Sequence, residues 1–320
     1  MIIMSQLKSM LRALSHKSSM FSRIYTYASE LKNKWYATWS DEDYLKMLFK
    51  KKTGRELNLE NPVGFCEKIQ WLKLHNRKPQ YTMMVDKVLA KEFVARVIGS
   101  EYVIPTLNVW SNADEIDFDT LPNEFVLKCN HNSGRGMCIC TDKANLDIKG
   151  TRYDLARGLE SDSYLPSREW PYKNVARKIL AEKYMTDSTM GQLIDYKFYC
   201  FNGTPKFLYV ALANYHNDGR KNDELSYMFF DWNLTPFYRT DHKPFPYAIE
   251  KPEKFDEMIQ IAGELSKGIP FVRVDLYYID GKIYFSEFTF SPGGGFDEFN
   301  PYEWEKEIGS WLDLSLVERN

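Results

Sequence analysis

Residues 271–293, FVRVDLYYIDGKIYFSEFTFSPG, contain two apolar and aromatic runs separated by Asp280-Gly281. Runs of β-branched and aromatic residues are typical of strands. Asp-Gly adopts with little strain the positive φ angles that both central positions of a type I′ turn require. The stretch therefore predicts an antiparallel hairpin, in which Asp275 and Glu287 lie nearly opposite each other on adjacent strands.

Two facing carboxylates in otherwise apolar strands repel each other and are costly to bury. One solution is a divalent cation between Asp275 and Glu287, and such hard oxygen ligands suit a Mg²⁺ ion that bridges nucleotide phosphates. The other is that one carboxylate faces solvent or pairs with Arg273. The spacing alone leaves both interpretations open.

A second informative stretch is 125–137, FVLKCNHNSGRGM, a predicted strand that ends near Lys128, followed by a polar loop and another strand. Gly134 and Gly136 allow the loop to turn several backbone N–H groups toward one point, which, together with a lysine, makes a cradle for phosphates. A hairpin loop beside a surface lysine is the alternative. The stretch is not a Walker A motif, because no Gly-Lys-Ser or Gly-Lys-Thr is present.

Outside these stretches the pattern is mostly helical as far as residue 98 and rich in short strands beyond it. Helical periodicity predicts helices at 67–74, 83–98, 146–159 and 252–267, with an additional N-cap at Ser40. β-branched and aromatic runs predict further strands at 178–184, 193–201, 206–213 and 226–231. Asn202-Gly203 predicts a second type I′ hairpin turn. Mixed hairpins and helices of this kind indicate the α+β class.

The composition excludes several classes of protein. The chain has 320 residues, 44% of them apolar, which is enough for a sizeable core and argues against disorder. Its 42 basic and 44 acidic residues give a net charge of −2. A protein with this charge does not bind nucleic acid through its overall charge. No segment approaches the ~20 apolar residues of a membrane span. Five cysteines, an odd number, favour reduced thiols in the cytoplasm, buried in strands rather than bound to metal.

The N-terminal residues 1–35 are basic, with six lysines and arginines against one glutamate. Leu7, Met10, Leu11 and Leu14 follow the spacing of one helical face. A basic amphipathic helix can lie on an anionic membrane surface, or it can pack on its own domain with a solvated basic face. Both interpretations stay open, whereas a cleavable signal is not expected because no apolar run follows the first charge.

Five motifs occur in order along the chain: Asp86-Lys87, Lys128 with the loop 130–136, Glu182-Lys183-Tyr184-Met185, Arg273-x-Asp275, and Glu287-x-Thr289 followed by Pro292-Gly293. In this order they resemble the nucleotide-binding motifs of the ATP-grasp superfamily. The stretches 67–73 (EKIQWLK) and 195–198 (DYKF) resemble signatures of the narrower TupA-like ATP-grasp family, which is associated with bacterial surface polysaccharide synthesis. The resemblance extends from about residue 67 to residue 295.

The resemblance implies an ATP-grasp fold of the α+β class, with two α+β subdomains that grip ATP and a helical N-terminal region. The expected divisions are a basic helical region 1–75, a pre-grasp segment 76–124, a first ATP-grasp subdomain 125–190 and a second one 191–320.

The resemblance also implies which residues bind the nucleotide. Two lysines would neutralise the α and β phosphates, the glycine loop would cover the γ-phosphate, and the hinge that begins at Glu182 would hold adenine and ribose. The implied ATP ligands are Lys87, Lys128, Asn130, His131, Ser133, Gly134, Glu182, Lys183, Tyr184, Met185 and Asp187. A histidine in such a loop can also shuttle protons, or it can donate an N–H to phosphate or backbone.

The last two motifs imply the metal and the reaction centre. Magnesium would be held by Asp275, Glu287 and Thr289, although superfamily members usually have asparagine where this chain has threonine, which leaves the number of metal ions open. Arg273 would face the transferring phosphoryl group and later an oxyanion, or serve as a structural salt bridge. Lys197 would reach the γ-phosphate or pair with Asp195 on the same strand face.

In the superfamily a carboxylate attacks the γ-phosphate of ATP, and an amine then displaces phosphate from the acyl phosphate. The resemblance therefore implies a carboxylate-amine ligase that takes a carboxylate-bearing glycan or nucleotide sugar and an amino acid, for capsule, O-antigen or teichuronopeptide-type polymers. A uronic acid is the expected carboxylate, and the expected location is the cytoplasm, with membrane contact only at the periphery. The motifs also fit a sugar phosphotransferase, or a non-catalytic nucleotide-binding scaffold of a glycan-assembly complex.

Overall fold

The computed structural model describes residues 35–134, 136–188, 193–212, 225–240, 242–245 and 248–318. The predicted basic helix at the N-terminus, and the membrane contact predicted with it, lie outside the described residues apart from Trp35. Within the described ranges, no helix combines the length and the apolar character needed to cross a bilayer.

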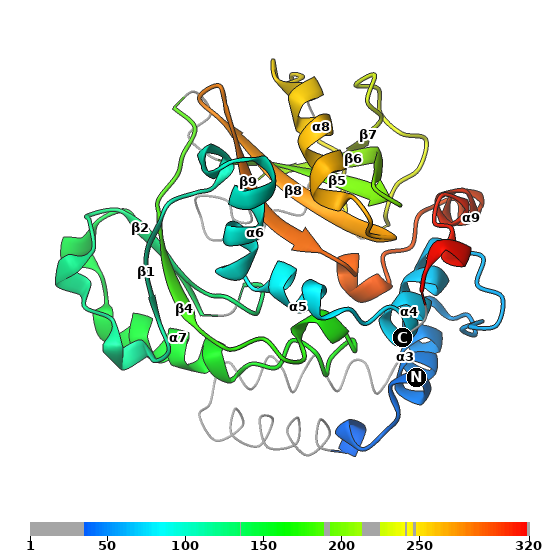
Figure 1. The fold of residues 1–320 in the computed structure, drawn as a ribbon, viewed down its shortest axis with the longest axis horizontal. Coiled ribbons are helices and arrows are strands. Elements are labelled where there is room, and N and C mark those ends of the chain that lie inside the picture. The colour runs from blue at the N-terminus through cyan, green and yellow to red at the C-terminus, as the bar shows by residue number, and fades with distance from the viewer. Residues whose placement is uncertain are drawn as a thin grey trace.

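The described strands form two antiparallel sheets, which lie on the left and at the upper right in Figure 1. The four-stranded sheet has the order β1 (Thr106–Trp110), β4 (Ile179–Lys183), β2 (Phe125–Cys129) and β3 (Met137–Cys140). The five-stranded sheet has the order β7 (Leu225–Met228), β6 (Thr204–Leu212), β5 (Ile194–Phe201), β8 (Phe271–Ile279) and β9 (Lys282–Thr289).

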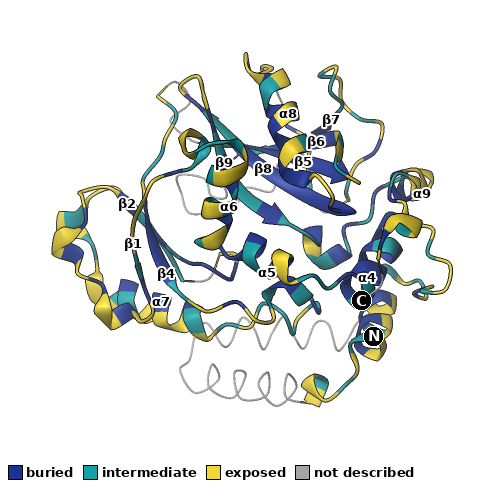
Figure 2. Ribbon diagram, viewed as in Figure 1, coloured by how far each residue is buried: buried dark blue, intermediate teal, exposed yellow. Residues whose placement is uncertain are grey.

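The five-stranded sheet is covered by helices on both faces. One core contains Tyr196, Phe198 and Val274 of the sheet and packs against α5 (Pro79–Val85), α6 (Leu89–Ile98) and α8 (Phe255–Ser266). The other core contains Tyr199, Phe207 and Phe271 and packs against α3 (Asp41–Thr53), α4 (Phe65–His75) and α9 (Tyr302–Ser310). Figure 2 shows the strands of this sheet buried and the outward sides of the helices exposed.

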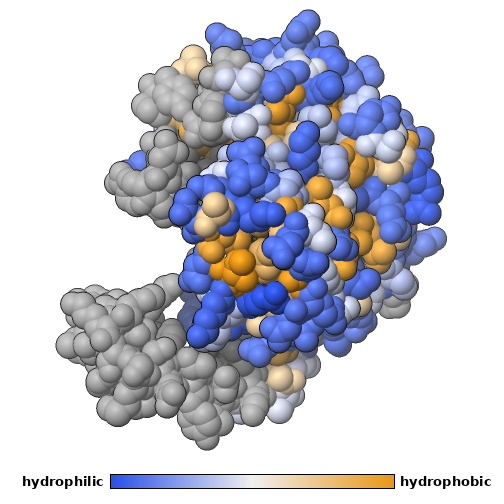
Figure 3. Space-filling view, turned by 90° about the vertical axis from the view of Figure 1, so that its left-hand side faces the viewer, coloured by the Kyte–Doolittle hydropathy of each residue, from blue (hydrophilic) through white to orange (hydrophobic). Residues whose placement is uncertain are grey.

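The four-stranded sheet has a core of its own. Helix α7 (Ile148–Glu160) packs Leu155 against Phe125, Leu127 and Ile179 on one face of that sheet. Figure 3 shows this side of the molecule, which is mostly hydrophilic with an area where apolar side chains gather. Short 3-10 helices complete the connections, at Ser100–Tyr102, Ala113–Glu115, Phe118–Thr120, Lys143–Asn145, Trp170–Tyr172, Pro292–Gly295 and Leu314–Leu316.

The predicted α+β class, the eight predicted strands and both hairpin turns are confirmed. Asn202 and Gly203 have φ angles of 49° and 78°, and Asp280 and Gly281 have 48° and 76°, as type I′ turns require. Strand β1 was not predicted, because its residues TLNVW make a short edge strand that is exposed over most of its length.

The helical period predicted over 83–98 is interrupted, and this is a correction with a local cause. Asp86 ends α5, and its Oδ1 accepts hydrogen bonds from the backbone N–H groups of Val88 at 2.9 Å and Leu89 at 3.4 Å, so it caps the start of α6. The break places Lys87 between the helices, where its N–H donates to the carbonyl of Asn130 at 3.1 Å. The first lysine is thereby joined to the loop after β2.

Period-two alternation places polar and aromatic side chains on one face of the five-stranded sheet. In β8 this face carries Phe271, Arg273 and Asp275, and in β5 it carries Lys197 and Tyr199. The aromatic end of the face belongs to the core under α4. The charged end is left as a polar patch at the border of that core.

Candidate active site

Four residues lie side by side across four strands at the charged end of the sheet. The register pairs Tyr209 with Lys197, Lys197 with Asp275, and Asp275 with Glu287. The predicted opposition of Asp275 and Glu287 is therefore confirmed. The next row along the sheet pairs Tyr199 with Arg273 and Arg273 with Thr289.

Asp275 is the centre of a buried charge network. Its carboxylate is fully buried and accepts from Arg273 Nε at 2.7 Å and from Arg273 Nη2 and Lys197 Nζ at 2.6 Å each. Lys197 Nζ also lies 3.2 Å from Asp195. The predicted pairing with Asp195 is therefore present, and the ammonium of Lys197 also contacts Asp275. Lys197 does not line the cavity described below, and its contact with the γ-phosphate stays a prediction.

The charges in this network shift the pKa values in opposite directions. Burial alone raises the pKa of Asp275, but the charges of Arg273 and Lys197 more than offset it and hold the pKa below its usual range. Burial raises the pKa of Asp195, and repulsion from Asp275 adds to that effect. Asp275 therefore stays ionised between two buried cations.

Glu287 and Thr289 lie beside this network but face an open space. Arg273 Nη2 donates to Thr289 Oγ1 at 2.9 Å and contacts Glu287 Oε1 at 3.3 Å. The second carboxylate oxygen of Glu287 has no hydrogen-bond partner among the described residues. The Glu287 side chain is 32% exposed, whereas that of Asp275 is not exposed.

These oxygen donors fit a magnesium ion. A carboxylate and a hydroxyl on one strand, next to a second carboxylate, are the hard ligands that Mg²⁺ prefers. Both oxygens of Asp275 already accept hydrogen bonds from cations. Glu287 is consequently the carboxylate that is open to a metal ion, and Asp275 holds the neighbouring side chains in place.

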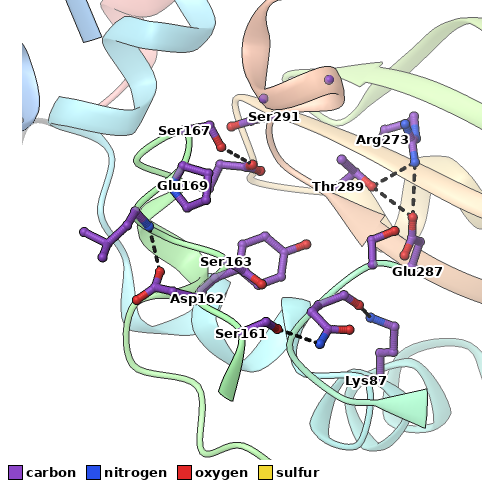
Figure 4. A pocket seen from close by; sticks show the side chains of 17 residues that line it. Lys87, Ser161, Asp162, Ser163, Ser167, Glu169, Arg273, Glu287, Thr289 and Ser291 are labelled. Carbon is purple, nitrogen blue, oxygen red and sulfur yellow. Dashed lines mark hydrogen bonds and ion pairs between the residues drawn. The ribbon is translucent and has the colours of Figure 1, made fainter. Parts of the chain in front are cut away.

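The open space is a cavity of about 610 Å³. On one side it is lined by Arg273, Glu287 and Thr289, and Lys87 lies at the same end (Figure 4). Ser167, Glu169 and Ser291 gather at the other end of the cavity. The cavity therefore has two different ends. One end carries the cations Lys87 and Arg273 with the oxygen atoms of Glu287 and Thr289, and the other end carries the carboxylate of Glu169.

The loop after β2 is anchored at its base and open at its tip. Asn130 Oδ1 accepts from the N–H of Lys178, and Asn132 Nδ2 donates to Gly158 O, at 2.8 and 2.9 Å. Lys87 Nζ donates to Asn132 O at 2.6 Å. Ser133, at the exposed tip, lines the cavity.

Glycine is required at position 136, where the loop returns to the sheet. Its φ is +61°, and an added Cβ would lie 2.8 Å from the Cα of Gly158. Gly134 also has a positive φ, +77°, but a Cβ added there would meet no atom within 4 Å. Gly136 therefore allows close packing, and Gly134 leaves the loop tip accessible.

His131 lies in this loop but points into the protein. The ring is 2% exposed, and Nε2 lies 3.1 Å from the carbonyl of Ser161, to which only an N–H can donate. Burial lowers the pKa of His131. The contact agrees with the predicted alternative in which the His131 N–H donates to the backbone. The ring does not line the cavity described above, and the predicted contact of His131 with ATP stays a prediction.

Glu182 and Lys128 are paired with each other. The buried carboxylate of Glu182 forms ion pairs with Lys128 through one oxygen and with Lys91 through the other. Burial raises the pKa of Glu182, but the two lysines outweigh it and the net pKa is lowered. The sequence did not single out Lys91, which also donates to Ile104 O at 2.8 Å.

Replacing Lys128 by alanine is expected to weaken ATP binding about tenfold or more without unfolding the protein. Glu182 keeps Lys91 as a partner, so the loss of one partly exposed cation removes phosphate attraction rather than stability. Isothermal titration calorimetry with ATP and Mg²⁺ measures the effect. The control is Lys149→Ala on the outer side of α7, and equal affinity of both variants would show that Lys128 has no nucleotide contact.

The predicted ATP ligands of the hinge after β4 do not line the cavity that contains Lys87. Lys183 donates its N–H to Pro105 O at 3.0 Å, and its side chain is exposed; Tyr184 and Met185 follow it and are half-buried. Asp187 accepts from the N–H of Asp280 at 3.1 Å and lines a separate cavity with Tyr196. The structure does not bring Asp187 to the cavity that contains Lys87.

One wall of the cavity is the segment 161–173, which was not predicted as part of the site. This segment follows α7 and includes the short helix Trp170–Tyr172. It contributes eight of the lining residues, which are Ser161, Asp162, Ser163, Leu165, Pro166, Ser167, Glu169 and Tyr172. Its irregular backbone has no periodicity, so no pattern in the sequence marks it.

Lys73 joins this wall to the opposite one. Its ammonium donates to Gln70 Oε1 and Ser167 O, both at 2.9 Å, and to Gly294 O. The side chain is 4% exposed, and among the described residues no carboxylate lies within ion-pair distance of it. Burial lowers the pKa of Lys73 to about 8.

Lys73 is expected to make stability depend on pH in the alkaline range. Between its folded pKa of about 8 and its ordinary value of 10.5, the unfolded chain binds more protons than the folded one, so the free energy of unfolding rises with pH. The full shift corresponds to roughly 3 kcal/mol. Urea denaturation across this range should show the rise in the wild type and not in Lys73→Met. Identical profiles of unfolding free energy against pH for the wild type and Lys73→Met would show that Lys73 does not cause the rise.

Two antiparallel sheets with a glycine loop on one and paired carboxylates on the other are the arrangement of an ATP-grasp protein. Residues 67–313 match the family model described as TupA-like ATPgrasp. The match spans most of the chain, and the protein belongs to the TupA-like ATP-grasp family. No curated protein matches the chain.

Several solved structures are similar to the chain at low sequence identity. D-alanine–D-alanine ligase from Bacillus anthracis has 17% identity and a TM-score of 0.37, over 65% of this chain and 57% of that one. D-cycloserine synthetase DcsG has 16% identity and a TM-score of 0.43, over 74% and 72%. The ATP-grasp ligase PsnB, complexed with Mg and ADP, has 11% identity and a TM-score of 0.41, over 75% and 61%. The chain spans less than two thirds of the first of these ligases.

Proposed function

We propose that this protein is an ATP- and Mg²⁺-dependent ligase that joins a carboxylate to an amine through an acyl phosphate. The observation that carries the proposal is the cationic end of the cavity, where Lys87 and the tip of the glycine loop face Arg273, Glu287 and Thr289. Cations and hard oxygen ligands at one end of a cavity suit a triphosphate with its metal ion. Family membership supports the same assignment.

The nucleotide would lie with its phosphates at this end. Lys87 and Lys128 would neutralise phosphate charge, and the backbone N–H groups around Ser133 and Gly134 would cover the γ-phosphate. Glu182, kept ionised by its two lysines, would accept a hydrogen bond from the adenine amino group. The other predicted ATP ligands, Asn130, His131, Lys183, Tyr184, Met185 and Asp187, are part of the same proposal, although none of them lines the cavity that contains Lys87.

The first chemical step would transfer the γ-phosphoryl group to a substrate carboxylate. A carboxylate oxygen attacks phosphorus, and the bond from phosphorus to the bridging oxygen of ADP breaks. Two hydrogen bonds to Asp275 fix the guanidinium of Arg273, and its Nη2 also donates to Thr289. The positive charge of Arg273 is therefore preorganised at the edge of the cavity. Glu287 and Thr289, beside Asp275, would hold a magnesium ion, and that ion would neutralise charge on the leaving ADP.

In the second step an amine would attack the acyl phosphate. The carbonyl oxygen gains negative charge in the tetrahedral intermediate, and Arg273 is placed to stabilise it. Collapse of the intermediate breaks the bond between the carbonyl carbon and the phosphate oxygen, which leaves an amide. Lys197 acts as a positioning residue, because its ammonium contacts Asp275 and Asp195 rather than the cavity.

We propose a uronic acid as the carboxylate substrate and an amino acid as the amine, in the synthesis of a surface polysaccharide at the cytoplasmic side. A cavity of about 610 Å³ accommodates a sugar-sized substrate beside the phosphates.

The test is to trap the acyl phosphate with hydroxylamine. Full-length protein is incubated with ATP, Mg²⁺ and a panel of uronic acids, and hydroxamate and ADP are measured together. Equal amounts of hydroxamate and ADP are the expected result. A phosphorylated sugar without hydroxamate, identified by mass spectrometry, would contradict the ligase and favour a phosphotransferase. Absence of any ATP turnover with every acid would favour a non-catalytic nucleotide-binding protein.

A further inference from the structure

We propose that Glu169 receives the ammonium group of the amine substrate and takes up its proton before attack on the acyl phosphate. This inference rests on the proposed function, and it gives a role to the end of the cavity that lies opposite Lys87 and Arg273. It follows from the position of Glu169, from the lack of an ion pair to Glu169 among the described residues, and from the way in which its segment is held.

Glu169 lies across the cavity from the reaction centre. It projects from the segment 161–173 next to Ser167 and Ser291, whereas Arg273, Glu287 and Thr289 lie on the other side (Figure 4). Ser167 Oγ donates to Glu169 Oε1 at 2.7 Å. That hydrogen bond fixes one oxygen and leaves the other for a ligand.

Three carboxylates line the cavity among the described residues, and two of them are already used. Asp162 is exposed, and its Oδ1 accepts from the N–H groups of Tyr164 and Leu165 at 2.8 and 2.7 Å. Glu287 accepts from Arg273 and faces the proposed metal position. Glu169 forms no ion pair within the described part of the chain, so it is the carboxylate that lacks a cation.

The charges along the cavity favour an ammonium group at Glu169. Lys87 and Arg273 make the opposite end positive, which suits phosphates and repels an amine cation. Around Glu169 the charged groups are Lys73 on α4, Arg273 on β8 and Asp297 after β9. Asp297 is paired with Arg239 at 2.6 Å, and the ammonium of Lys73 donates to backbone carbonyls. The substrate ammonium would therefore be the direct partner of Glu169.

Burial makes Glu169 a better proton acceptor than an exposed glutamate. Burial raises its pKa, the charge of Lys73 and the Ser167 hydrogen bond reduce the shift, and the net pKa remains raised. A base whose pKa is closer to the working pH transfers protons more effectively.

The wall that carries Glu169 is held in a fixed position. The neighbouring Arg168 is 1% exposed and donates to Leu165 O at 2.9 Å. Its Nε lies 3.0 Å from Asp41, and its guanidinium stacks over Tyr44 at 4.2 Å. Lys73 links Ser167 of this wall to Gly294 of the opposite wall. A group preorganised in this way suits the positioning of a reacting amine.

The ammonium gives one proton to the Glu169 carboxylate, and the neutral nitrogen attacks the carbonyl carbon of the acyl phosphate. The tetrahedral intermediate expels phosphate by breaking the bond between carbon and the phosphate oxygen. The second proton on nitrogen leaves with that phosphate, and Glu169 returns its proton to water.

The first test measures ammonium binding without knowledge of the natural substrate. [¹³C]Methylammonium is titrated with full-length protein in the presence of Mg²⁺ and ADP, and the line width of its NMR signal is followed. Broadening with the wild type and loss of most of that broadening in Glu169→Gln is the expected result. Glu160→Gln, at the exposed C-terminal end of α7, is the matched control. No broadening, or equal broadening in Glu169→Gln, would overturn the proposal.

The second test separates Glu169 from the proposed function. Hydroxylamine attacks as a neutral amine, so Glu169→Gln should form hydroxamate at a rate within a few-fold of the wild type. Ligation of an amino acid should fall by about 100-fold or more in the same variant, and its pH profile should lose the acidic limb. Equal loss of both reactions would overturn the proposal, whereas failure of the wild type to form hydroxamate would contradict the ligase itself.

Discussion

Glu287→Gln is expected to reduce ATP turnover by at least about 100-fold while the protein stays folded. One carboxylate oxygen of Glu287 has no hydrogen-bond partner in the part of the chain that the structure describes, the side chain lines the cavity, and the contact of the other oxygen with Arg273 is long at 3.3 Å. Loss of its charge therefore removes the metal ligand and little stability. ADP release in the presence of Mg²⁺ and substrate, measured with thermal denaturation of the same sample, checks both parts.

Glu264→Gln, on the exposed side of α8, is the matched control and should behave as the wild type. Turnover by Glu287→Gln within a few-fold of that control would remove Glu287 from the metal site. A large fall in thermal stability would instead mean that Glu287 is a structural partner of Arg273.

Asp275→Asn is expected to lower the free energy of unfolding by about 3–5 kcal/mol, because it leaves Arg273 and Lys197 without their shared anion in a buried site. The lowered pKa of Asp275 means that this stabilisation is present at neutral pH and is lost as the pH falls below about 4, the ordinary value for aspartate. Urea denaturation at neutral and acidic pH measures both effects.

Asp195→Asn is the comparison that sharpens this prediction. Asp195 is also buried, but its pKa is raised, and Lys197, at 3.2 Å, is the cation that pairs with it among the described residues, so neutralising Asp195 should cost clearly less stability. Equal losses for the two variants would show that the network does not centre on Asp275.

The turns and the pairing next to them follow from local sequence. Asp280-Gly281 determines its turn, and the pairing continues from Ile279 with Lys282 to Leu276 with Phe285. A β-bulge between Asp275 and Leu276 then shifts the register by one residue, and this shift places Asp275 opposite Glu287. A similar shift between Tyr199 and Cys200 follows the turn at Asn202-Gly203. The two hairpins can therefore be predicted from their turns, whereas the bulges that align the site residues cannot.

Features that depend on distant contacts could not be predicted in this way. The wall 161–173 has no regular period, and it is fixed by contacts such as that of Arg168 with Asp41, which lies 127 residues earlier in the chain. The partner of Glu182 in α6, Lys91, is placed by tertiary packing alone. Spacing suggested a cation between Asp275 and Glu287, and the side chain found there is that of Arg273.

The site residues therefore form two groups, those whose positions follow from one sheet and those that are brought together by tertiary packing. Arg273, Asp275, Glu287 and Thr289 are ordered by one sheet, so the sequence motifs and the geometry agree. Glu169 and Lys73 come from separate elements and meet only in the folded chain. The cationic end of the cavity was accessible to sequence reasoning, and the end that would hold the amine was not.

The most direct measurement is a crystal structure of the full-length protein with a non-hydrolysable ATP analogue and Mn²⁺, located by anomalous scattering. The account predicts the triphosphate in the cavity between Lys87 and Glu287, with the metal ion within about 2.0–2.4 Å of a Glu287 oxygen, as for oxygen-bound divalent cations. A nucleotide bound elsewhere, or a metal ion remote from Glu287 with the cavity filled only by solvent, would contradict it.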